Sequence, residues 1–124
     1  PQSIVVVGGS NNVHKPGGRL VRNLLDGKYK GELYVVNAKE DDVQGLKSYH
    51  SVHDIPETEL AIISIPGPAC PEAVDVLAKQ KNVKAFIVIS AGFGEETHEG
   101  ALLEDRILET VNKYGASNTL SIIV

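Results

Sequence analysis

The chain has 124 residues, of which 42% are hydrophobic and 23% are charged, and its net charge at pH 7 is -4. This length suits one domain that buries a core without metal or disulfides, and the composition argues against disorder. A protein that coats nucleic acid or membrane surfaces normally carries a basic patch, which this sequence lacks, and no apolar run approaches the roughly 20 residues of a membrane span. We therefore predict a cytoplasmic protein that binds neither nucleic acid nor membrane.

Short apolar runs alternate with helical patterns along the chain. The expected strands cover residues 4–7, 33–36, 60–65 and 86–89, and a short extra strand is expected at 46–49. The main runs are rich in valine and isoleucine and nearly continuous, which is typical of parallel strands covered on both faces. The alternation predicts a single-domain α/β fold: a Rossmann-like, doubly wound, mainly parallel sheet with helices on both faces.

Three helices are expected between these strands. The first covers about 18–26 and ends at Gly27, the second begins near Pro71, and the third ends before Gly115. Proline suits a first helical turn because its missing N–H would have no partner there, and glycine is common directly after a helix. Cys70, the only cysteine, lies beside this proline, and we favour a small packing residue over a reactive thiolate.

Residues that suit a ligand follow four of the expected strands. Because the carboxyl ends of parallel strands lie on one edge of the sheet, where such folds bind ligands, these segments should outline one nucleotide-sized crevice. After the first strand, glycines let backbone N–H groups approach a phosphate, Ser10 offers a hydroxyl, and the next helix directs its positive end at the site. The four segments are 8–10, 37–39, 66–68 and 90–93.

The loop after the first strand departs from two known nucleotide motifs. A dinucleotide fingerprint G-x-G-x-x-G that starts at Gly8 would need glycines where the chain has Ser10 and Val13, and the P-loop pattern is also missing. After the second strand, NAD-binding enzymes usually place an acidic residue, whereas this chain has Lys39. A lysine there favours a ribose that carries a phosphate, as in NADP or coenzyme A. The alternative for Lys39 is a solvated charge beside three acidic residues.

An ordered set of segments extends to about Gly115: Val-Gly-Gly-Ser at 7–10, Lys-Pro-Gly-Gly-Arg at 15–19, and the segments 29–39, 43–49, 54–57, 60–66 and 88–93. Together they resemble the CoA-binding domain of the NDP-forming acyl-CoA synthetases, which include the succinyl-CoA synthetase alpha subunit and ADP-forming acetyl-CoA synthetase. The resemblance implies that the chain binds coenzyme A or acyl-CoA and that ligase and ATP-grasp parts are its partners. Since the sequence starts without methionine and stops after an apolar run, we expect residues 1–124 to be a piece of a longer polypeptide.

The resemblance also implies particular contacts with the cofactor. The glycine turn and the segment 15–17 would meet the phosphates, Lys39 the 3′-phosphate, Ile65 and Pro66 the adenine or its ribose, and 90–93 the pantetheine arm. No catalytic or metal-binding residue is implied. The cofactor-binding residues so predicted are Gly8, Gly9, Ser10, Asn11, Lys15, Pro16, Gly17, Asn37, Lys39, Ile65, Pro66, Ser90, Ala91, Gly92 and Phe93.

Two other functions stay open from the sequence. An NADP-dependent oxidoreductase domain shares the fold and the basic residue after the second strand, although the glycine spacing differs, and a free-standing CoA-binding regulator would use the same site. Among the four histidines, His14 lies in the glycine-rich loop and is a candidate phosphate contact. His50 and His53 flank a surface turn, and His98 lies in an acidic stretch that does not match a zinc motif.

Overall fold

The computed structural model describes residues 2–89 and 119–123. Strands alternate with helices along these residues, as the sequence predicts, except that β2, β3 and β4 follow one another directly. The elements in chain order are β1 (Ser3–Val7), α1 (Pro16–Asp26), β2 (Glu32–Val36), β3 (Asp42–Val43), β4 (Leu46–Tyr49), the 3-10 helix η1 (Val52–Asp54), β5 (Leu60–Ile63), the 3-10 helix η2 (Gly67–Ala69), α2 (Cys70–Gln80), β6 (Ala85–Ile89) and β7 (Thr119–Ile123).

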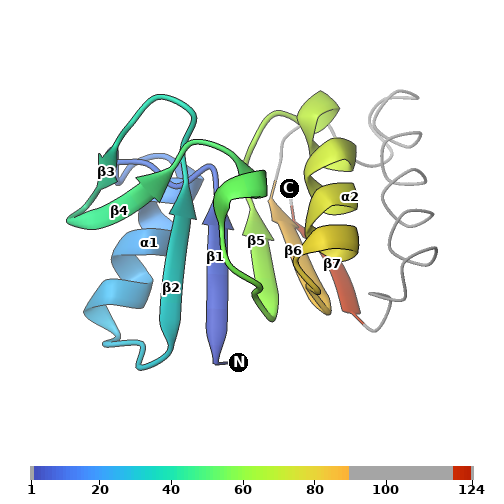
Figure 1. Ribbon diagram of the computed structural model, residues 1–124. Helices are drawn as coiled ribbons and strands as arrows, with labels where there is room; N and C mark the ends of the chain where they lie inside the picture. The colour runs from blue at the N-terminus through green and yellow to red at the C-terminus, as the bar shows by residue number, and fades with distance from the viewer. Residues whose placement is uncertain (1, 90–118, 124) are drawn as a thin grey trace.

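The strands of the described residues form one sheet in the order β3-β4-β2-β1-β5-β6-β7 (Figure 1). Neighbouring strands run parallel, except that β3 and β4 are antiparallel. The order reverses beside β1, which lies between β2 and β5, and this is the place where doubly wound sheets open a crevice. The predicted fold class is therefore confirmed.

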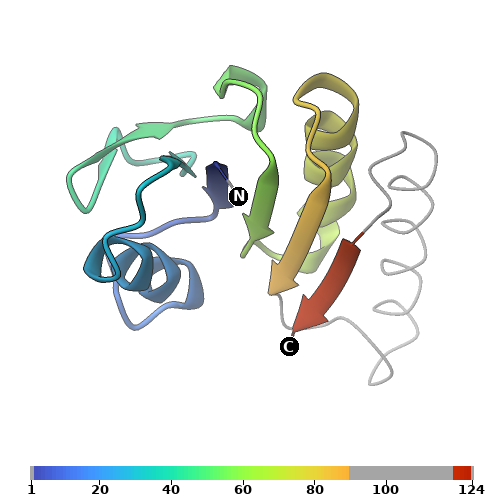
Figure 2. The same ribbon diagram turned by 90° about the horizontal axis from the view of Figure 1, so that it is seen from below.

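Helices α1 and α2 cover opposite faces of the sheet (Figure 1 and Figure 2). Alternate residues of β1 divide between the two cores: Ile4 and Val6 pack in the core that contains α1, and Val5 and Val7 pack in the core that contains α2. Because successive strand side chains point to opposite faces, a strand with a helix on each side needs apolar residues throughout. This explains why the strands read as continuous apolar runs. No helix among the described residues has the length and hydropathy needed to cross a bilayer.

Two of the element boundaries that differ from the prediction affect the candidate site. Helix α1 begins at Pro16 rather than near Gly18, because proline's fixed φ already suits the first helical position. Strand β5 ends at Ile63, so that Ile65 belongs to the connection between β5 and α2. The third predicted helix lies outside the described residues.

Candidate functional site

A cavity of about 450 Å³ lies at the carboxyl edge of the sheet, over the ends of β1 and β2 and beside the start of α2. The structure brings five predicted site residues together in its lining: Gly8, Lys15, Asn37, Lys39 and Ile65. They come from three connections that are far apart in the sequence. The lining also contains Ala38, which belongs to the predicted segment 37–39, and residues that the sequence did not single out as a site, namely Val7, Val36, His50, Ser51, Val52, His53, Ala69, Glu72 and Ala73.

Six other predicted residues do not line this cavity. Two of them, Pro16 and Gly17, form the first turn of α1 instead of a loop, and a Cβ on Gly17 would collide with the carbonyl oxygen of Gly8. Glycine at position 17 therefore lets the start of the helix pack directly on the glycine turn. The other four residues that do not line the cavity are Gly9, Ser10, Asn11 and Pro66. The remaining predicted residues, Ser90, Ala91, Gly92 and Phe93, lie outside the described residues.

Gly8 forms the turn that directly follows β1. Its φ of +91° lies in the left-handed region, and a Cβ at this position would collide with the carbonyl oxygen of Ser64. Its backbone N–H donates to the carbonyl oxygen of Val36 at 2.8 Å. Gly8 is therefore held between the ends of β2 and β5, where a side chain has neither the conformation nor the space it needs.

The side chain of Asn37 holds the turn that presents Lys39. Its Oδ1 accepts hydrogen bonds from the backbone N–H groups of Lys39 at 2.9 Å and Glu40 at 3.0 Å, which is the usual way an asparagine stabilises a turn. Its Nδ2 donates to the carbonyl oxygen of Gly9 at 2.9 Å. Asn37 thus connects the end of β2 to the glycine turn, a structural role in addition to its place in the cavity lining.

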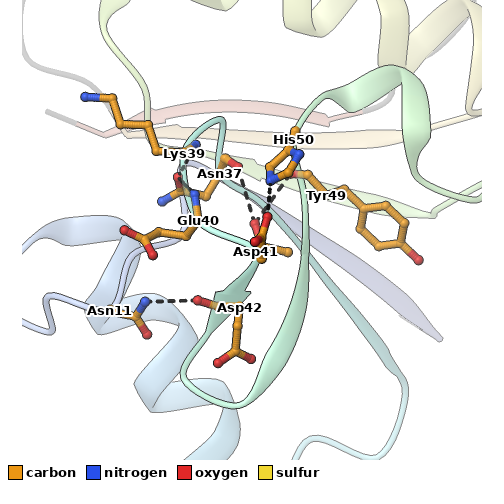
Figure 3. A network of polar contacts seen from close by, with 9 residues as sticks. Asn11, Asn37, Lys39, Glu40, Asp41, Asp42, Tyr49 and His50 are labelled. Atoms are coloured by element: carbon orange, nitrogen blue, oxygen red, sulfur yellow. Dashed lines mark hydrogen bonds and ion pairs between the residues drawn. The ribbon is translucent and has the colours of Figure 1, made fainter.

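The side chain of Lys39 is exposed and forms no ion pair with another described residue. Figure 3 shows it extending away from Glu40, Asp41 and Asp42. Asp41 instead lies beside His50, with 2.8 Å between Oδ1 and Nε2, and the two form an ion pair when the imidazole is protonated. The acidic neighbours therefore leave the Lys39 ammonium group available to an anion in the cavity.

The β3–β4 hairpin braces the glycine loop. Gln44 and Gly45 form its two-residue turn with φ of +50° and +88°, and left-handed residues at both positions match the twist of paired strands. Asn11 joins the loop to this hairpin, because its Nδ2 donates to the carbonyl oxygen of Asp42 at 3.0 Å (Figure 3). Its Oδ1 accepts the N–H of Gln44 at 2.7 Å. Both polar atoms of the Asn11 side chain are thus engaged within the protein.

Gln44 holds the two sides of the loop together, because its Nε2 donates to the carbonyl oxygens of Ser10 at 2.8 Å and Gly18 at 2.9 Å. We expect Gln44→Glu to lower the free energy of unfolding by about 2 kcal/mol at pH 7, since a carboxylate there cannot donate and faces two carbonyl oxygens. These surroundings would raise the pKa of the new carboxyl group, so the lost stability should return as the pH falls and the group becomes protonated.

Urea unfolding of the variant and the unsubstituted chain at pH 7 and pH 5 measures this effect. Gln44→Ala is the control: it removes both hydrogen bonds together with the buried Oε1, which has no hydrogen-bond partner among the described residues, and its loss should not depend on pH. If Gln44→Glu lowered the free energy of unfolding equally at both pH values, the assigned contacts would be contradicted.

His50 and His53, which the sequence places at a surface turn, line the cavity as well. They do so because η1 packs against α2, which brings the turn beside Glu72 at the start of that helix. Glu72 could have been predicted as a site residue from the sequence, because it lies in the first turn of a helix that follows a strand end. The cavity therefore combines two lysines and two histidines with a single carboxylate.

Cys70 is completely buried, and its Sγ lies 3.7 Å from the carbonyl oxygens of both Ile65 and Pro66. A buried thiol of this kind is inert. The prediction of a small packing residue is confirmed.

Two tyrosines outside the cavity have altered acidity. Burial, followed by the negative charges of Glu59 and Glu32, raises the pKa of Tyr29. Burial also raises the pKa of Tyr34, and Glu32 and Tyr49 add to the effect. These phenols are therefore neutral at physiological pH and add no charge near the site.

The family follows from comparison with known proteins. A family model described as CoA binding domain matches residues 2–118. The chain belongs to this CoA-binding domain family. The predicted family is thereby confirmed, because relatives with similar sequences include ADP-forming ligases of coenzyme A.

Three proteins illustrate how this CoA-binding domain is related to known ligases and synthetases. It is 41% identical over 116 residues to acetate–CoA ligase (ADP-forming) II of Archaeoglobus fulgidus. The aligned region covers 93% of this chain and 17% of the relative. It is 40% identical over 117 residues to the alpha subunit of acetate–CoA ligase (ADP-forming) II of Pyrococcus furiosus. This aligned region covers 93% of this chain and 25% of the relative. The solved dinucleotide forming acetyl-coenzyme A synthetase 1 of Ca. Korarchaeum cryptofilum, in complex with phosphate and ADP, has a TM-score of 0.88 at 33% identity, covering 100% of this chain and 26% of that chain.

The CoA-binding domain described here is therefore homologous to that of the ADP-forming acyl-CoA synthetases. It spans about a quarter or less of the length of these three relatives.

Proposed function

We propose that this domain binds coenzyme A or acyl-CoA in the cavity at the carboxyl edge of its sheet. The observation that carries the proposal is that a chain of the CoA-binding family holds Gly8 and two lysines around one cavity, one of them being Lys15, the residue that precedes helix α1. Helix α1 has no side-chain cap and no acidic residue in its first turn, so its free N–H groups and positive end suit a diphosphate. Lys15 and Lys39 add the positive charge that a polyanionic ligand requires.

We assign the parts of coenzyme A as the family resemblance implies, and the chemistry of the lining supports this assignment. Gly8 and Lys15 hold the diphosphate, Lys39 holds the 3′-phosphate of the ribose, and Ile65 packs on the base. Ser10 lies outside the cavity lining, but it follows Gly8 by two residues. Its Oγ accepts the N–H of Asn12 at 3.0 Å, and its O–H remains able to donate to a phosphate oxygen. The pantetheine arm follows residues 90–93 in this proposal.

The complete reaction belongs to a longer protein or an assembly in this proposal. The domain would supply the bound cofactor, and ligase and ATP-grasp parts would activate the acid and transfer the acyl group to the thiol. The support is the small share of each relative that the chain covers, 17% and 25% for the two ligases. The cytoplasmic location expected from the composition stays a prediction.

The binding proposal predicts a particular role for Lys39. Coenzyme A should bind at least about tenfold more tightly than 3′-dephospho-CoA, because a charge-assisted hydrogen bond contributes about 1.5 to 3 kcal/mol. Lys39→Ala should bind the two ligands equally, since only the 3′-phosphate meets this ammonium group. Isothermal titration calorimetry with both ligands gives the four dissociation constants.

Lys30→Ala is the matched control. Lys30 is also exposed, but it precedes β2 and therefore lies at the opposite edge of the sheet. Its removal changes the net charge equally and should preserve the preference for coenzyme A. Equal binding of the two ligands by the unsubstituted domain would exclude Lys39 from the site, and no measurable binding of coenzyme A would overturn the proposed function.

A further inference from the structure

One carboxylate lines a cavity whose other charged groups are basic. Glu72 lies in the first turn of α2, where an acidic side chain is favourable beside the positive end of the helix. Its side chain is exposed and makes no hydrogen bond or ion pair with another described residue. A carboxylate only accepts hydrogen bonds, so Glu72 would repel a phosphate and needs a donor on the ligand.

The position of Glu72 within the lining indicates which part of the ligand it meets. The glycine turn and the two lysines come from the connections that follow β1 and β2. Glu72 belongs to the side formed by η1, α2 and the connection before α2, and its neighbours in that part of the lining include the apolar residues Val52, Ile65 and Ala73. His50, Ser51 and His53 also line this side, and Glu72 is its one carboxylate. Apolar residues with a few placed polar groups are typical of a site for a small organic ligand. This side therefore suits the base, away from the phosphates.

We propose that Glu72 accepts a hydrogen bond from the exocyclic amine of the adenine and so makes the cavity select a 6-amino purine over a 6-oxo purine. The proposal rests on the proposed binding of coenzyme A and adds the recognition of the base. An amine at C6 of the purine donates to a carboxylate, whereas an oxygen at C6 is an acceptor that the carboxylate repels. Selectivity then comes from an attractive contact with one base and a repulsive contact with the other.

Calorimetric titration with coenzyme A and with desamino-CoA, which has hypoxanthine in place of adenine, tests the proposal. The unsubstituted domain should bind coenzyme A about tenfold more tightly than desamino-CoA, and Glu72→Ala should bind the two ligands alike. Removing a negative charge near a polyanion also tightens the binding of both ligands by a similar factor. The ratio of the two dissociation constants is therefore the decisive quantity. Glu72→Gln should also lose the preference, because an amide can accept from the amine or donate to the oxygen.

Asp75→Ala is the matched control, since Asp75 lies one turn further along α2 and does not line the cavity. This variant should show the same ratio of the two dissociation constants as the unsubstituted domain, because only Glu72 contacts the base in this proposal. A ratio near one in the unsubstituted domain, or an unchanged ratio in Glu72→Ala and Glu72→Gln, would overturn the selection of the base while leaving coenzyme A binding intact. Failure of the unsubstituted domain to bind coenzyme A would overturn the proposed function and this inference together.

Discussion

Replacing Gly8 by alanine should lower the free energy of unfolding by about 3 to 5 kcal/mol and abolish the binding of coenzyme A. Two effects add at this position. An L-residue is disfavoured at a φ of +91°, and the new Cβ would collide with the carbonyl oxygen of Ser64. The Ser64 backbone cannot easily retreat, because its N–H donates to the carbonyl oxygen of Val7 at 2.7 Å and extends the pairing of β5 with β1.

Gly45→Ala separates the conformational effect from the collision. Gly45 has a similar φ of +88°, but no heavy atom lies within 4 Å of a Cβ built at that position. We expect this variant to lose only about 1 kcal/mol, from the left-handed backbone alone. Urea unfolding followed by circular dichroism gives both losses. Equal losses for the two variants would show that Gly8 is not confined between β2 and β5.

Replacing Phe86 by alanine should lower the free energy of unfolding by about 3 to 5 kcal/mol. Phe86 lies in β6, its exposed fraction is 0%, and it packs in the core beneath α2 with residues such as Leu77. Its partner on β5 is Ala61, a small residue on the same face of the sheet, so the ring occupies space that the strand pairing leaves open. Truncation would leave a cavity there that this close-packed core could fill only in part.

Two substitutions calibrate this result. Phe86→Leu keeps much of the volume and should cost about 1 kcal/mol, and Val13→Ala at an exposed position should stay within about 0.5 kcal/mol of the unsubstituted chain. Val13 has an exposed fraction of 38% and makes a suitable surface reference. Chemical denaturation at one temperature compares all three. A loss for Phe86→Ala no larger than that for Val13→Ala would exclude the ring from the core.

The predicted strand positions agree with the structure because their signal is local. Apolar runs of the length of β1, β2, β5 and β6 are typical of strands buried on both faces in a parallel sheet with helices on each side. The general rule for such sheets then placed Gly8 and Asn37 at one edge before any contact between them was known. Ile65 was predicted as a site residue from the family resemblance. Strand β3 was not predicted, because two residues, Asp42 and Val43, carry no recognisable periodicity.

The roles of the polar side chains around the loop could not be predicted from their residue types. Asn11 and Asn37 have the chemistry of ligand contacts, yet their side chains bond to backbone groups 28 to 33 positions away in the sequence. Gln44 bonds in the same way to Ser10 and Gly18. Such pairs form only once the hairpin is folded against the loop, and no local pattern records them.

The fold class and the edge of the sheet that holds the cavity follow from the amino-acid sequence alone, because strand periodicity and glycine turns are properties of short segments. The family follows from the resemblance that an ordered set of such segments carries. Tertiary structure was needed to show that Glu72, His53 and Val52 share this cavity with Lys39. The physical reason is that their proximity depends on η1 packing against α2, a contact between elements that have no pattern in common along the chain.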